Sequence, residues 1–221
     1  MNDGSASLDS FIDKWRQRWP EWGVMAVFVP QAQRVTVAAW FALLQELRDA
    51  AWAGIDPAPG LAKLAWWQEE LRGWSRGARR HPLGEALQKL DAPWGDLGGS
   101  LSVLPATRSP ASQADDTMAL EAFSHSLLAC ERSLFGGGVP VPPDVAATVA
   151  LLRGERALVQ GDREGAVALA GLDVSMAVSR PRRLQQAVVQ GRLRQFASGR
   201  QASRLPALRL LFTGWRVARQ G

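Results

Sequence analysis

Carboxylates embedded in an apolar segment are the first residues whose spacing could support chemistry. The stretch FALLQELRDAAWAG, from Phe41 to Gly54, has a helical apolar pattern and carries Glu46 and Asp49 near its middle. Two carboxylates four residues apart lie on one face of a helix, where they can hold Mg²⁺ ions that bridge to a diphosphate. Glu46 and Asp49 are three residues apart and share a face only roughly. They are candidates for a residual diphosphate site, with helix solvation or an ion pair as the alternative.

A further carboxylate lies in the stretch ALLRGERALVQGD, from Ala150 to Asp162. Glu155 is the candidate here, but the residue one turn later is Val159, so Glu155 has no acidic partner at that spacing. Asp162 falls in an expected turn. Neither stretch therefore contains the carboxylate pair that a diphosphate-bound metal requires, and no metal ligand is assigned.

The C-terminal part of the chain is strongly basic. The net charge is +5, but residues 174–221 contain ten Arg and no Lys, Asp or Glu, so the rest of the chain sums to −5. Such a segment can contact anionic lipid, an acidic partner or nucleic acid. Nucleic acid is not expected, because no helix-turn-helix pattern or interleaved aromatic residues accompany the charge. The candidates for bidentate binding of a diphosphate or lipid phosphate, with solvated helix faces as the alternative, are Arg182, Arg183, Arg192 and Arg194.

Other common catalytic groups are scarce. One Cys and two His argue against a disulfide framework and against the usual zinc sites. His81 precedes Pro82 at an expected helix start and is interpreted as structural, and Cys130 as a small buried hydrophobe. No nucleophile elbow or phosphate-binding loop is present.

The elements that must position these residues are helices. Ser7 is expected to cap a helix over residues 8–18, and Pro30 to open one that reaches about residue 52. Further helices are expected over about 61–76, from Pro82, over about 114–136 with a cap at 115–117, from Pro142 or Pro143, over 180–198 and over 205–220. Residues 93–114 are either a long connection or a distorted helix. The chain is predicted to be all-α, with residues 1–221 in one domain of seven to nine helices.

The order of these segments resembles the squalene/phytoene synthase family. The stretch FALLQELRDAAW is followed by KLAWWQEELRGW and then HPLGEAL, and SRLPALRLLFTGWRVAR is similar to the closing helix of the family. The resemblance is clear over residues 41–90 and collinear to the end. It is nearest to the branch that includes a complex I assembly factor, in which the acidic motifs of the enzymes are eroded.

The resemblance implies an isoprenoid-synthase-like helical bundle around a central cavity. In the family, two acidic helices face each other and hold Mg²⁺ over an apolar tunnel, so residues 41–52 and 145–160 should face each other. The resemblance places Arg48 and Trp52 at one pair of carboxylate positions, and Gly154 and Leu158 at the other. A cation at Arg48 would repel Mg²⁺. Candidate cavity-lining residues, with core packing as the alternative, are Phe41, Trp66 and Trp67.

The expected function is therefore that of a degenerate relative, a pseudoenzyme without Mg²⁺-dependent prenyl diphosphate condensation and without a cofactor. It would act as a lipid-binding, scaffold or assembly protein, with a prenyl lipid, an anionic membrane surface or a protein as partner. The alternative is an active prenyl transferase of isoprenoid biosynthesis with divergent motifs and bound Mg²⁺. No apolar run is long enough to span a bilayer, and the first residues are acidic and polar. A cytoplasmic protein is expected, with peripheral membrane contact as an extension of that expectation.

Overall fold

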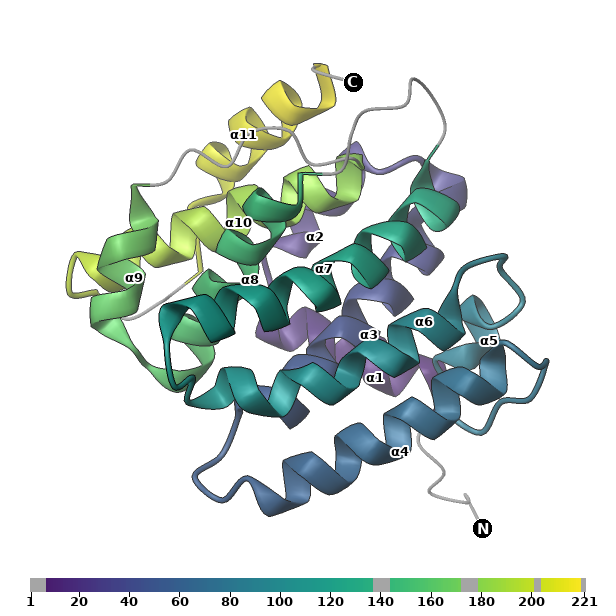
Figure 1. The fold of residues 1–221 in the computed structure, drawn as a ribbon. Helices are drawn as coiled ribbons and strands as arrows, with labels where there is room; N and C mark the ends of the chain where they lie inside the picture. The colour runs from purple at the N-terminus through teal and green to yellow at the C-terminus, as the bar shows by residue number, and fades with distance from the viewer. Residues whose placement is uncertain (1–6, 137–143, 172–178, 201–203, 220–221) are drawn as a thin grey trace, which may run out of the picture.

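Helices make up the fold (Figure 1). The computed structural model describes residues 7–136, 144–171, 179–200 and 204–219, and these ranges contain no strand. Short 3-10 segments cover Ala26–Phe28, Gln31–Gln33 and Leu101–Arg108. The α-helices are α1 (Leu8–Arg18), α2 (Trp22–Met25), α3 (Arg34–Trp52), α4 (Ala58–Trp74), α5 (Gly84–Leu87), α6 (Trp94–Ser100), α7 (Gln113–Phe135), α8 (Val145–Gln160), α9 (Arg163–Ala170), α10 (Arg180–Ala197) and α11 (Ala207–Arg219). The predicted all-α class is confirmed.

Side-chain caps explain where several helices begin. The hydroxyl of Ser7 accepts a hydrogen bond from the Ser10 N–H, as predicted for α1. The cap of α7 is Ser112 rather than a residue of the 115–117 group, because its hydroxyl accepts from the Asp115 N–H. Asp144 caps α8 through the Ala147 N–H. The prolines expected to open α8 lie outside the described residues.

Other boundaries differ from the sequence expectations. Pro30 precedes a 3-10 turn, and α3 itself begins at Arg34. The helix expected from Pro82 is only one turn long, α5. Residues 93–114 are a distorted helical region, since α6 passes directly into a 3-10 segment that contains Pro105. Proline removes a backbone donor, which is consistent with the irregular geometry there.

The third helix, α3, forms the centre of the bundle. Of its 19 residues, 15 are buried, so it is enclosed on all sides by its neighbours. Contacts to α3 come from α1, α4, α5 and α8, among others. Figure 1 shows α4, α5 and α6 on one side of the bundle and α9, α10 and α11 on the other. Gly60 permits the close packing of α4, because a Cβ atom there would lie 2.1 Å from the Ala50 carbonyl oxygen.

Aromatic side chains fill the space around α3. The ring of Phe41 packs against Trp22 at 5.0 Å and Trp15 at 6.0 Å between centroids. Trp67 is fully buried, whereas Trp66 is 38% exposed. The pocket described below is not lined by Phe41, Trp66 or Trp67. The buried rings of Phe41 and Trp67 contribute to core packing, and cavity lining by these three residues stays a prediction.

None of the helices within the described ranges is both long enough and apolar enough to cross a membrane.

Candidate functional site

A buried ion pair joins α3 to α8. Nη1 of Arg48 lies 2.7 Å from Oε1 of Glu155, and the two side chains are only 6% and 1% exposed. The segments 41–52 and 145–160, which were expected to face each other, lie in direct contact through α3 and α8. Arg48, the cation expected to repel Mg²⁺, is thus paired with Glu155, the candidate carboxylate of α8.

The environment of this ion pair is only partly hydrogen-bonded. Oε1 of Glu155 also accepts from Gln185 at 3.2 Å, and Gln185 in turn accepts from the indole N–H of Trp22 at 2.7 Å. Nε and Nη2 of Arg48 and Oε2 of Glu155 are buried and have no partner among the described residues. Burial lowers the pKa of Arg48, although the nearby Glu155 opposes this effect. Two donor atoms of a buried cation are thus left for another group.

The other positions assigned to the family's carboxylates serve packing. A Cβ atom at Gly154 would lie 2.7 Å from the side chain of Leu193, so α8 and α10 are in close contact there. Trp52 is buried, and its indole N–H donates to the Thr107 hydroxyl at 2.9 Å. Leu158 is half-buried and lines a pocket. None of these side chains can coordinate a metal ion.

The candidate carboxylates of α3 do not join Glu155. Glu46 lies between Lys14 at 2.7 Å and Lys63 at 2.5 Å. Burial raises the pKa of Glu46, but the hydrogen bonds and charges of the two lysines outweigh it, so the pKa is lowered. Both carboxylate oxygens of Asp49 accept a hydrogen bond from Nε2 of Gln45, at 2.9 Å. The described residues hold no cluster of three His, Cys, Asp or Glu side chains able to bind a metal.

The four candidate anion-binding arginines do not form one site. Arg182 is fully buried and its guanidinium contacts Glu131, with Nε 3.0 Å from Oε1. Arg192 makes a bidentate pair with Glu21, at 3.0 and 2.6 Å. Arg183 is half-buried, and exposed Arg194 donates to the Ala170 carbonyl. Two of these arginines therefore neutralise acidic residues from earlier parts of the chain.

A pocket of about 350 Å³ opens beside the Arg48–Glu155 pair. It lies between α1, α3, α8, α10 and the segment before α11. Arg18 and Arg204 were not predicted to lie here, because they are distant in the chain and belong to no motif. The residues lining it are Gln17, Arg18, Trp19, Pro20, Gln45, Arg48, Glu155, Leu158, Val159, Arg192 and Arg204.

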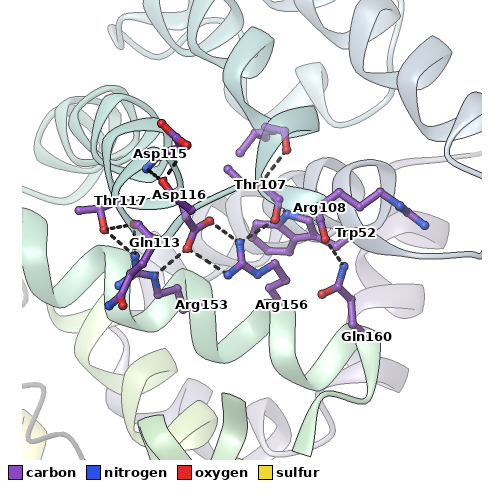
Figure 2. Close-up of polar contacts among 12 residues, drawn as sticks. Trp52, Thr107, Arg108, Gln113, Asp115, Asp116, Thr117, Arg153, Arg156 and Gln160 are labelled. Atoms are coloured by element: carbon purple, nitrogen blue, oxygen red, sulfur yellow. Dashed lines mark hydrogen bonds and ion pairs between the residues drawn. The ribbon is translucent and has the colours of Figure 1, made fainter. Parts of the chain in front are cut away.

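A second polar network clamps α7 to α8 (Figure 2). Asp116 accepts from Arg153 at 2.8 Å and from Arg156 at 2.5 Å, and Arg156 also donates to the Thr107 carbonyl. Burial raises the pKa of Asp116, but these arginines outweigh it and the pKa is lowered. Both carboxylate oxygens of Asp116 accept hydrogen bonds from arginines of α8. The network therefore joins α7 to α8, and Asp116 is not left open to a ligand.

The turn that contains His81 is organised by a buried carboxylate. Glu70, 1% exposed, accepts from the backbone N–H groups of Arg80 and His81 at 2.7 and 2.8 Å and from the indole of Trp74. His81 packs against Phe11 and Trp67, and its Nδ1 accepts from the Leu83 N–H. This is a structural role, as interpreted from the sequence.

His81 gives the protein a pH-dependent stability. Burial, opposed by Glu46 and Glu70, lowers the pKa of His81 to about 4. The unfolded chain titrates near 6.5 and binds the proton first, so stability present above pH 6.5 is lost as the pH falls toward 4. We expect this loss to be about 2 kcal/mol after allowance for partial exposure. Urea titrations between these pH values should show a smaller loss in His81→Asn than in the wild type. Replacement of exposed His125 with Asn is the control, and equal pH slopes in all three proteins would contradict the prediction.

The chain was compared with family models, curated proteins and solved structures. None of the three comparisons returned a match.

Proposed function

We propose that this protein is a non-condensing relative of the squalene/phytoene synthases, with an isoprenoid-synthase-like helical bundle, that binds an anionic lipid surface. The absence of Mg²⁺-dependent condensation is supported by the Arg48–Glu155 ion pair, which joins the helices whose carboxylates would otherwise hold the metals. The binding function rests on one observation, the exposed face of α11.

Incubation with farnesyl or geranylgeranyl diphosphate and Mg²⁺ should yield no squalene or phytoene. The candidate carboxylates form no Mg²⁺-binding pair, because Glu155 is engaged by Arg48 and Glu46 by Lys14 and Lys63. Radiolabelled substrate and extraction of apolar products provide the measurement, with a known synthase as positive control. Product above the no-enzyme background would favour the active prenyl transferase instead.

The outer face of α11 is apolar and uncovered. Leu208, Leu211, Phe212 and Trp215 are 81%, 44%, 61% and 47% exposed. Their spacing of three and four residues places all of them on one side of the helix. The opposite side packs inward through Leu210 and Gly214, and a Cβ atom at Gly214 would lie 2.3 Å from the ring of Phe28. The face is therefore held outward by close packing of the helix beneath it.

Arginines flank this apolar face. Arg209, Arg216 and Arg219 are exposed, and the described part of α11 contains no acidic residue. An amphipathic helix with large apolar side chains and a basic border is typical of one that lies in a membrane interface. Three arginines near an anionic surface are worth about 3 kcal/mol before screening, and insertion of Phe212 and Trp215 adds apolar burial. Charge complementarity therefore favours lipid over an uncharged protein surface, and the binding should be reversible.

Vesicle co-sedimentation tests this function. The wild type should pellet with vesicles that contain about 30% phosphatidylserine at low salt, and much less with neutral vesicles or at high salt. Phe212→Ser with Trp215→Ser, and Arg209→Gln with Arg216→Gln, should each weaken pelleting. The matched controls are Ile55→Ser, a fully exposed apolar residue elsewhere, and Arg76→Gln, an exposed arginine outside α11.

Two results would overturn the lipid proposal. Equal pelleting with neutral and anionic vesicles, or none with either, would remove the electrostatic basis. A concentration-dependent dimer that the Phe212 and Trp215 substitutions abolish would show instead that a second copy covers α11.

A further inference from the structure

The pocket of about 350 Å³ beside Arg48 has the chemistry of an anion site. We propose that it binds a small phosphate monoester directly through arginines, without a bridging metal. This proposal goes beyond lipid-surface binding, because no residue of the pocket belongs to α11.

The buried cation at the base of the pocket carries the argument. Nε and Nη2 of Arg48 have no hydrogen-bond partner among the described residues, although the side chain is only 6% exposed. Leaving charged donors buried and unpaired is costly. Glu155 contacts only Nη1 and Arg48 lines the pocket, so the two unpaired donors place a buried positive charge beside the pocket that a bound oxyanion would neutralise. Arginine presents such donors in a planar fork that suits phosphate oxygens.

The rim of the pocket adds uncompensated positive charge. Arg18 and Arg204 are exposed and have no ionic partner among the described residues. Arg192 is fixed by Glu21 and lies 4.2 Å above the ring of Trp19. The arginines that line the pocket are Arg18, Arg48, Arg192 and Arg204. Glu155 and Glu21 neutralise two of these four charges, which leaves a net charge of two positive units. A phosphate monoester carries about −1.5 to −2 at neutral pH, so this balance suits it better than a monocarboxylate.

The remaining wall indicates what the phosphate is attached to. Trp19, Pro20, Leu158 and Val159 supply apolar surface, and the volume is at the lower end of the range for small-ligand pockets. Gln45 is oriented by the indole N–H of Trp19, at 2.9 Å, and by Asp49. Glu155 is the carboxylate that lines the pocket, and it is already paired with Arg48, which disfavours a bridging metal between protein and phosphate. A compact phosphate ester with a short apolar group fits this lining.

Calorimetric titration of the full chain with phenyl phosphate tests the proposal, with inorganic phosphate and phenol as comparison probes. We expect saturable one-site binding of phenyl phosphate, weaker binding of inorganic phosphate and none of phenol. EDTA should change neither affinity. Arg18→Gln and Arg204→Gln, both at exposed positions that fold should tolerate, should each weaken phenyl phosphate binding about tenfold. Arg76→Gln, an exposed arginine outside the pocket, should leave it unchanged.

Several results would overturn the inference. These are no saturable binding at probe concentrations up to about 10 mM, affinity unchanged in both rim variants, or binding that requires Mg²⁺. Arg48→Met with Glu155→Leu supplies a second test, since it removes the buried donors while keeping the base of the pocket filled. Unchanged affinity in that variant would also contradict the proposal. Arg18→Gln should retain vesicle binding, so failure of the pocket and failure of the lipid face can be told apart.

Discussion

Replacement of Glu131 with alanine is expected to lower the free energy of unfolding by about 3–5 kcal/mol. The side chains of Glu131 and Arg182 are 1% and 0% exposed, and the guanidinium contacts both carboxylate oxygens. The same carboxylate accepts from the indole N–H of Trp40 at 2.8 Å. Removing it leaves a buried cation and a buried indole donor without partners. Since small domains are stable by only about 5–15 kcal/mol, the variant should lose a large part of its stability.

Urea unfolding followed by circular dichroism measures this loss. Glu121→Ala is the matched control, because Glu121 lies on the same helix but is exposed and makes no ion pair among the described residues. We expect the midpoint of the control to stay near that of the wild type. A Glu131→Ala midpoint equal to that of Glu121→Ala would show that the Arg182–Glu131 pair contributes no stability.

Replacement of Arg48 alone is expected to cost about 3 kcal/mol, and the loss should be largely recovered when Glu155 is replaced as well. Arg48→Met leaves Glu155 buried with Gln185 as its remaining hydrogen-bond partner, and Glu155→Leu removes the ion-pair partner of the buried Arg48. The double variant replaces both charges with apolar groups of similar size. Because desolvation of two charges is removed, it should be at least as stable as either single variant.

A double-mutant cycle decides this prediction. The coupling energy between positions 48 and 155 should be about 2 kcal/mol or more, whereas Arg48 and the distant Glu121 should be additive. Additive losses at positions 48 and 155 would mean that the two side chains are paired only weakly in solution.

Local chemistry explains which parts of the fold were predictable from sequence. The bounds of α1 were predicted correctly, because Ser7 supplies a cap and the apolar residues repeat at helical spacing. The N-cap of α7 was predicted three to five residues too far along the chain, because Asp115, Asp116 and Thr117 are as suitable for capping as Ser112. The region 93–114 gave no period, because α6 and the following 3-10 segment have different residues per turn.

The candidate site was less accessible to sequence reasoning. Arg48 was identified as a substitution that disfavours a metal, but its partner lies on another helix and pairs with it only through tertiary packing. Arg182 and Arg192 read as a basic run because their partners, Glu131 and Glu21, are far away in the chain. Arg18 and Arg204 carry no local signal at all. A sequence shows the charge of each side chain but not which side chain lies beside it in space. These ion pairs could therefore be identified only from the structure.

The pairing of Arg48 with Glu155 also constrains how this sequence can evolve. A change at either position passes through an intermediate with a lone buried charge, whereas a joint change does not. The two sites should therefore vary together among descendants of this gene. An acidic residue at position 48 would set two carboxylates against each other in the core, so the ion pair restricts each position to changes that the other can accommodate.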